Sequence, residues 1–321
     1  MRFTNKYFNS TLIDKKIQIS KENTILTQKK ADLLIAFISM AWGSSYLLMK
    51  LGLDGLGVFN LIALRFGIAF LITAPIFIKS VIKANKKSIW YGAILGFILF
   101  CIFTFLMIGL KTTTASSAGF LTSTAVVFVF ILQVIITGKK PNLPITAGVL
   151  LTICGIALLT IKESLVFETG SVLCIMGAFS YACHIIITNH WTHKVDGLVL
   201  GIFQLGFASL YGLIFSVIFE NPSLPQNSTD WIAVLGLAIV CSAFGFVVQP
   251  VAQQYTTPER TGLLFSLEPV FSALFGYIFL YEVLQIKGYI GAALVLCGVF
   301  VSGIKSDRMI LLETDKSLKT Q

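Results

Sequence analysis

The feature that most constrains this chain is a series of long apolar segments, which starts after Ala31 and recurs almost to the C-terminus. Each segment is close to the roughly 20 residues that an α-helix needs to cross the hydrocarbon core of a bilayer. Strands of a membrane barrel would instead be about 10 residues of alternating polarity. The sequence therefore predicts an all-α membrane protein with ten transmembrane helices, over residues 32–50, 58–78, 89–110, 115–137, 143–161, 170–190, 197–219, 231–253, 262–281 and 286–304.

Composition excludes the main alternatives. Of the 321 residues, 56% are hydrophobic and 12% are charged, and the mean hydropathy is +0.86. A soluble domain carries about 25% charged residues, so too few charges are present to cover a water-exposed surface. The 27 phenylalanines and the apolar majority exclude intrinsic disorder. All six cysteines fall inside apolar runs, which indicates small buried side chains rather than a disulfide framework or a zinc cluster.

The net charge of +9 is distributed as an orientation signal for membrane insertion. No basic face interleaved with aromatic residues is present, so nucleic acid is not an expected partner. With the N-terminus inside, the cytoplasmic segments hold 19 of the lysines and arginines and the outer loops hold four. We therefore expect a multi-pass protein of the inner (plasma) membrane with both termini in the cytoplasm. Residues 1–30 form a polar basic arm without a cleavable signal sequence, and residues 306–321 form a polar tail.

An internal repeat divides the apolar part of the chain. A shift of 143 residues aligns 111–162 with 254–305 without a gap, and it superimposes Gly148 on Gly291 and Gly155 on Gly298. We expect two five-helix repeats, over residues 31–162 and 163–305. Because five is odd, the two copies must cross the membrane in opposite senses, and such inverted repeats place a substrate site between them near the midplane.

Three short stretches give the chain a family resemblance. They are AWGSSY at 41–46, LRF at 64–66 and LEPVF at 267–271. Together with the ten spans and the repeat, they resemble the drug/metabolite transporter superfamily, in its EamA-type branch, over about residues 32–304. The resemblance implies secondary transport, most often export, of amino acids or other small metabolites. The chain departs from symmetry at Ala125-Val126, where the second repeat has Glu268-Pro269.

Two ionisable residues lie well inside predicted spans. Arg65 is seven residues into the second span and Glu268 six residues into the ninth. Such a group is costly unless it faces a partner or a water-filled cavity. Alternatively, Arg65 extends to the outer interface, and Glu268 belongs to a structural helix break at Pro269. The rise of 1.5 Å per residue separates their depths by about 10 Å, so we expect both to face one cavity rather than each other.

Further polar and aromatic residues extend this set, and for each of them a helix–helix contact is an equally good interpretation. As a group they fit an apolar pocket with a few placed polar groups, in which Arg65 can attract a carboxylate and the aromatic rings can cover an amine. The predicted substrate-binding residues are Trp42, Ser45, Tyr46, Arg65, Tyr181, His184, Gln204, Gln249 and Glu268.

Motifs for other chemistries are missing from the sequence. It has no phosphate-binding loop for ATP and no hydrolase or zinc-protease signature. His190 and His193 are three residues apart, but no third ligand is nearby, so we expect neither a metal nor a cofactor.

The sequence thus predicts a transporter that works by alternating access and moves a small polar or amphipathic metabolite, with protons as a candidate coupling ion. Uptake or exchange is the alternative within transport. An intramembrane enzyme or a structural membrane protein is the alternative from another class.

Overall fold

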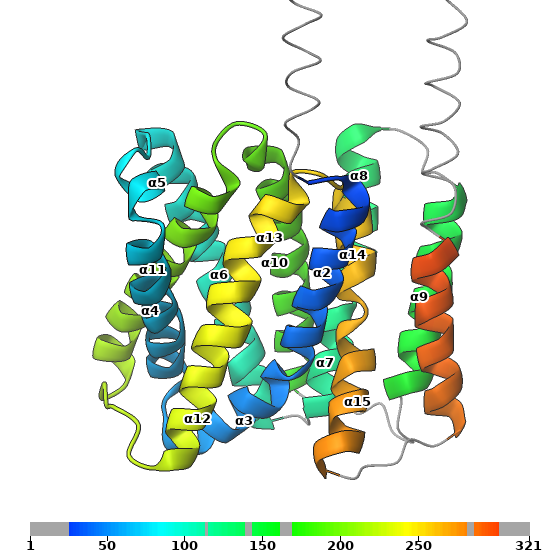
Figure 1. Cartoon of the computed structure of the whole chain (residues 1–321). Coiled ribbons are helices and arrows are strands. Elements are labelled where there is room, and N and C mark those ends of the chain that lie inside the picture. Colours follow the sequence, from blue (N-terminus) through cyan, green and yellow to red (C-terminus); the bar gives the residue numbers. More distant parts are fainter. Residues whose placement is uncertain (1–25, 113–114, 139–142, 161–168, 281–285, 302–321) are drawn as a thin grey trace, which may run out of the picture.

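The computed structural model describes residues 26–112, 115–138, 143–160, 169–280 and 286–301, and within these ranges every regular element is a helix. The helices lie side by side in a single bundle (Figure 1). They are α2 (Gln28–Gly43), α3 (Ser45–Gly55), α4 (Val58–Ile76), α5 (Ile78–Ile82), α6 (Lys86–Thr112), α7 (Ala115–Ser123), α8 (Ala125–Thr137), α9 (Leu143–Thr160), α10 (Thr169–Thr192), α11 (Gly197–Phe219), α12 (Ser228–Gly236), the π-helix η1 (Leu237–Phe244), α13 (Gly245–Gln253), α14 (Pro258–Phe265), α15 (Glu268–Leu280) and a last helix, Ile286–Val301.

Six helical segments are long and apolar enough to cross a membrane: Gln28–Gly55, Val58–Ile76, Lys86–Thr112, Thr169–Thr192, Gly197–Phe219 and Ser228–Gln253. Leu121–Thr137, Leu143–Leu158 and Ile286–Val301 are shorter apolar helices. The predicted span 262–281 is divided between α14 and α15. The all-α membrane fold is confirmed, while the number of ten crossings stays a prediction.

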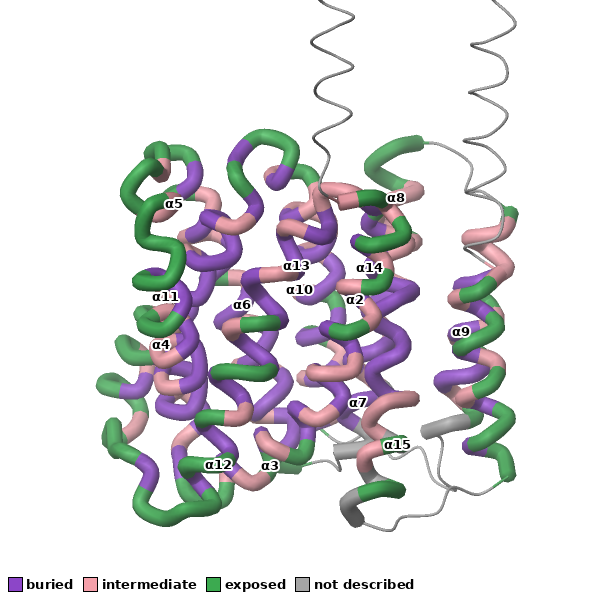
Figure 2. The backbone as a smooth tube through the Cα atoms, in the orientation of Figure 1, coloured by how far each residue is buried: buried purple, intermediate pink, exposed green. Residues whose placement is uncertain are grey.

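Apolar side chains cover the outside of the bundle as well as its interior. Leu71, Val217 and Phe300 each expose more than 60% of their surface, and the tube in Figure 2 is purple on inward faces and green outside. In water such a surface would be an aggregation hazard. Against lipid tails it is stable, because the helices satisfy their own backbone hydrogen bonds.

Three of the predicted spans are interrupted within their length. The first breaks at Ser44, whose Oγ donates to the Ala41 carbonyl at 2.7 Å. Another breaks at Thr124, between α7 and α8, and a third between Phe265 and Glu268. Serine and threonine hydroxyls that bond to carbonyls of the preceding turn compete with the helical ladder and bend helices. These breaks bring side chains and helix ends to the centre of the bundle.

Glycines bring α9 and the last helix into close contact. A Cβ atom built on Gly155 would lie 2.6 Å from the Gly291 carbonyl oxygen, and one on Gly298 would lie 2.6 Å from the Gly148 carbonyl oxygen. Small residues allow this approach in a membrane. As one partner moves up the chain the other moves down, so the two helices are antiparallel. The two contacts are also equivalent under the 143-residue shift.

Candidate functional site

Trp42, the residue before Gly43 at the end of α2, organises the centre of the bundle. Its side chain is buried, and its Nε1 donates to the Cys241 carbonyl oxygen at 2.7 Å. Cys241 lies in η1, a π-helical segment of the kind that often marks functional sites. The indole ring packs against Tyr181, Phe246 and Phe265, with ring centroids 5.9, 4.6 and 4.8 Å away.

The rings of Trp42, Tyr181 and Phe246 line a cavity of about 30 Å³, room for about two water molecules. The remaining wall combines aliphatic side chains with a few polar ones, a composition typical of small-molecule sites. The lining residues are Trp42, Ser45, Tyr46, Leu99, Ile102, Phe103, Leu106, Thr122, Tyr181, Phe246 and Glu268.

Glu268 is the one acidic residue among those lining this cavity, and only 6% of its surface is exposed. It is the first residue of α15, so the helix break places its carboxyl group against α3. The Tyr46 hydroxyl donates to Glu268 Oε2 at 3.4 Å, a long hydrogen bond. A smaller cavity of about 10 Å³ lies on the α7–α8 side and shares Thr122, Tyr181 and Glu268 with the first.

Arg65 lies next to the cavity but does not line it. The residue is fully buried on α4, and its Nε donates to Ser242 Oγ at 3.1 Å. The guanidinium carbon lies 4.2 Å from the centre of the Phe103 ring and 4.8 Å from that of Phe66, which is cation–π geometry. The two terminal nitrogens have no hydrogen-bond partner among the described residues. Phe103 itself lines the cavity, so the arginine contacts a residue of the cavity wall.

His184 and Gln204 form a buried pair that contacts Phe246. Gln204 Nε2 donates to the Phe246 carbonyl oxygen at 2.7 Å. Its Oε1 lies 2.8 Å from His184 Nε2, and because an amide oxygen can only accept, the histidine donates there. Gln249, one turn further along α13, donates from its Nε2 to Gln253 Oε1 at 3.4 Å.

The structure therefore divides the predicted binding residues into two groups. Trp42, Ser45, Tyr46, Tyr181 and Glu268 line one cavity. The other predicted residues are buried but do not line this cavity; they are Arg65, His184, Gln204 and Gln249.

Sequence reasoning missed several residues of the site. Thr122 lines both cavities, and Ser242 binds Arg65. The shift of 143 residues places Thr122 over Phe265, which also lines the second cavity, but Phe265 was not a predicted site residue either. No group of three metal-ligating side chains occurs within the described ranges.

Helices that cover a membrane span, an apolar exterior and a central cavity with few polar groups define a multi-pass membrane protein that handles a small molecule. Comparison with known proteins gives the family. The EamA-like transporter family matches the chain twice, over residues 29–161 and 168–304. This chain belongs to that family.

Individual relatives agree with this assignment. Two proteins of Archaeoglobus fulgidus, each named an uncharacterized transporter, are 30% and 29% identical to the chain. The first alignment covers 86% of this chain and 98% of the relative, and the second covers 86% of both. A crystal structure of a protein 19% identical superimposes with a TM-score of 0.73 over 88% of this chain and 99% of its own, which shows the shared fold.

Proposed function

We propose that the protein is a secondary-active exporter of amino acids or similar small metabolites, working by alternating access at the central cavity. The observation that carries the proposal is the cavity itself, where one buried carboxylate and several hydroxyl groups lie among aromatic rings. Membership of a transporter family supports the transport of a small molecule. Export and the amino-acid class rest on the family resemblance and on the chemistry of the site.

The proposal includes the architecture. The chain crosses the membrane ten times, in two inverted repeats over residues 31–162 and 163–305. It lies in the inner membrane with both termini in the cytoplasm. The antiparallel glycine contacts between α9 and the last helix support the inversion, because a pseudo-two-fold axis in the membrane plane requires such a pair. In Figure 1 the beginning of α2 and the end of the last described helix also lie at the same end of the bundle.

An amino acid carries one positive and one negative group, and the site offers a counterpart for each. Glu268 can hold a substrate amine, with Trp42 and Tyr181 covering it. The free terminal nitrogens of Arg65 suit a carboxylate, which they would bind in a bidentate manner once the Phe103 ring moves aside. The proposed substrate-binding set therefore keeps all nine predicted residues, with Phe103 and Thr122 added.

The cavity must widen during transport. A volume of about 30 Å³ holds water but not an amino acid, so helices or aromatic side chains must move to admit one. This is the behaviour expected of an occluded conformation in an alternating-access cycle.

Counterflow in proteoliposomes tests the proposal. Vesicles loaded with one member of a metabolite panel should accumulate the labelled form of a substrate transiently, and protein-free vesicles should not. If no amino acid or related metabolite gives counterflow while the protein is monodisperse and correctly inserted, the proposal is wrong. Cells overproducing the protein should also accumulate less of a toxic amino-acid analogue; higher accumulation would favour uptake instead.

Reporter fusions test the topology. Fusions after Lys87, Lys140 and Lys194 should report the cytoplasm, and fusions after Asp54 and Asn227 the outside. A cytoplasmic signal after Asn227 would contradict the inverted repeat.

A further inference from the structure

Several buried polar atoms that have no hydrogen-bond partner among the described residues lie on two helices that extend from the central cavity. They are Tyr181 Oη, His184 Nδ1 and Thr188 Oγ1 on α10, and Gln249 Oε1 and Gln253 Nε2 on α13. All five residues are buried, and α10 packs against α13. We call these residues the polar seam. An unpaired buried polar atom costs free energy, so five of them in one place require an explanation.

The seam runs from the cavity to one end of the bundle. Tyr181 lines the cavity, and His184 and Thr188 follow at helical spacing on the same face of α10. Gln249 and Gln253 lie four residues apart on α13, after Phe246, which also lines the cavity. Both helices reach, just beyond the seam, the end of the bundle where α2 begins (Figure 1).

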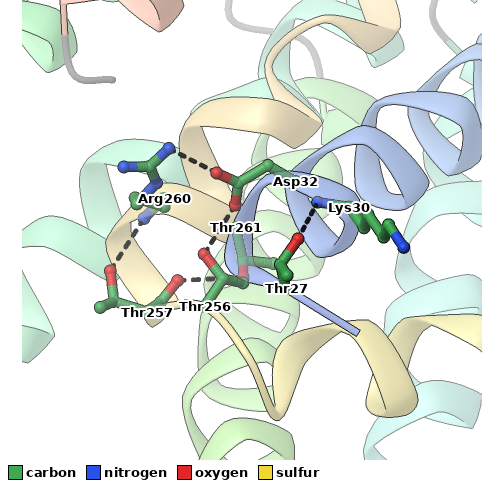
Figure 3. A network of polar contacts seen from close by, with 7 residues as sticks. All are labelled: Thr27, Lys30, Asp32, Thr256, Thr257, Arg260 and Thr261. Carbon is green, nitrogen blue, oxygen red and sulfur yellow. Dashed lines mark hydrogen bonds and ion pairs between the residues drawn. The ribbon is translucent and has the colours of Figure 1, made fainter. Parts of the chain in front are cut away.

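A set of charged and polar side chains lies at that end, and we call it the polar cap: Asp32, Asn189, Thr256 and Arg260 (Figure 3 shows all but Asn189). Asp32, on α2, forms an ion pair with Arg260 on α14, and Thr256 Oγ1 donates to Asp32 Oδ1 at 2.9 Å. The cap lies at the boundary between bundle and solvent, because the Arg260 and Asp32 side chains are 16% and 13% exposed.

Asn189 ties the same turn to α10. Its Nδ2 donates to the Gln253 and Thr256 carbonyl oxygens at 2.7 and 2.8 Å. The turn between α13 and α14 is therefore held by α2 from one direction and by α10 from the other. Releasing Asp32 would remove the ion pair and a hydrogen bond together, while the seam lies directly behind.

We propose that the polar seam is the inner half of the substrate pathway and that the polar cap is the gate that closes it in this conformation. The inference rests on the proposed transport function and extends it. When α2 and α14 separate from α10 and α13, the unpaired atoms of the seam become hydrated and contact the passing solute. The seam offers hydroxyl, amide and imidazole groups and no carboxylate or lysine, so it suits a solute without net charge, such as a zwitterion.

The other end of the bundle lacks this arrangement among its described residues. There Glu220 accepts hydrogen bonds from the backbone amides of Phe59 and Asn60, at 3.2 and 2.9 Å. A carboxylate at the amino end of α4 stabilises that helix end. Glu220 and its partners do not line the central cavity, so this contact has a structural role.

Cysteine accessibility tests the proposal without knowledge of the substrate. Thr188→Cys places a thiol in the seam, at its last position on α10 before the cap, and Ile187→Cys places one at the same depth on the face of α10 that packs against a separate cluster around Leu95 and Leu200. Each is treated with a charged, membrane-impermeant thiol reagent on either face of sealed vesicles. The chain with its native cysteines alone gives the background.

Arg260→Gln should open the gate. From the face that carries the cap, labelling of Thr188→Cys should rise about fivefold, the change expected when an ion pair worth about 1 kcal/mol is removed from a two-state equilibrium. Asp32→Asn should act similarly, and the exchanged pair Asp32→Arg with Arg260→Asp should return labelling toward the original rate. Ile187→Cys should stay at background throughout.

The proposal is overturned if Thr188→Cys stays as unreactive as Ile187→Cys in both gate variants, or if both cysteines become equally reactive, which would indicate general loosening. Circular dichroism and size-exclusion chromatography of each variant identify misfolded chains, and the exchanged pair then supplies the decisive comparison. If the protein gives counterflow but the seam cysteine is never labelled, this inference is wrong and the transport proposal stands. A seam that opens in a chain without counterflow would refute the transport proposal, and with it the substrate pathway, while the cap would still be a gate.

Discussion

The two broken spans α7–α8 and α14–α15 offer the most informative comparison within the molecule. α8 begins at Ala125 and α15 begins at Glu268, and these positions are 143 residues apart, the same shift that aligns the repeats. The two breaks thus occur at equivalent places. Their local sequences differ, because the first copy has Ala125-Val126 where the second has Glu268-Pro269.

The comparison separates architecture from chemistry. Proline cannot be the common cause of the breaks, since the first lacks it. Both breaks instead have a hydroxyl that donates to a carbonyl three residues earlier: Thr124 to Leu121 and Ser266 to Leu263, each at 2.5 Å. The carboxylate is present only in the second copy. The fold is therefore repeated, whereas the carboxylate of the site and the polar seam belong to the second half.

The largest expected effect comes from removing that charge. Glu268→Gln keeps the shape and most hydrogen bonds of the side chain, so we expect the chain to insert and transport to fall at least tenfold, about 1.4 kcal/mol in the limiting step. If the carboxylate exchanges a proton during the cycle, the pH dependence of transport should also flatten. Initial rates of counterflow between pH 5 and 8 measure both effects.

Ala125→Ser is the matched control in the first copy, because it adds a small polar group at the equivalent position. It should leave transport within about twofold of the original chain, about 0.4 kcal/mol. Equal losses of transport in the two variants would mean that both breaks are equally sensitive to any change. The carboxylate of the second break would then have no special role in transport.

Arg65→Lys should have the next largest effect, again about tenfold on transport of a substrate with a carboxylate. Lysine keeps the charge but loses the planar fork that binds a carboxylate in two places. The corresponding amines without a carboxylate should be affected less, so the ratio of the two rates is the measurement. Ser242→Ala, which removes only the Nε partner of Arg65, should cost less than the lysine substitution. An unchanged ratio in Arg65→Lys would make the arginine a purely structural residue.

Much of the fold could be predicted from the sequence because the membrane imposes it. Apolar runs of about 20 residues predicted the helices. The repeat alignment paired Gly155 with Gly298, and the structure places these two glycines at equivalent helix contacts. Helix interruptions were harder, because Ser44 and Thr124 interrupt helices without proline or a charged residue. The π-helix η1 has no pattern in its apolar sequence that distinguishes it from an α-helix.

The candidate site was predictable only as a set of polar residues in apolar surroundings. That reasoning found Trp42, Tyr46 and Glu268, which the structure brings to one cavity. It could not foresee that Arg65 packs on Phe103 and does not line the cavity, because depth along a helix does not give the direction of a side chain. Asp32 and Arg260 were overlooked as partners, since they are 228 residues apart and lie at the ends of predicted spans.

A smaller effect, on stability, tests the equivalence of the two copies. Gly155→Ala and Gly298→Ala should each destabilise the bundle by roughly 1 kcal/mol, the low end of the cost of overpacking, because the added methyl group would meet a carbonyl oxygen at 2.6 Å in both cases. Thermal unfolding in detergent measures the effect. Gly119→Ala is the control, since its nearest neighbour would be 3.7 Å away. Unequal losses in the two variants would contradict a symmetric helix pair.

The smallest effect is expected from the proline that distinguishes the two breaks. Pro269 is the second residue of α15, where a helix has no internal partner for the backbone amide, so the ring costs no hydrogen bond there. Pro269→Ala should therefore leave the break in place and change transport by less than about twofold, about 0.4 kcal/mol. Val126→Pro makes the reciprocal change at the equivalent position of α8 and should be tolerated for the same reason. Counterflow rates measure both variants against Glu268→Gln. A tenfold loss in Pro269→Ala, with the fold intact, would show that proline itself sets the break in the second copy, and the hydroxyl explanation would then hold only for the first.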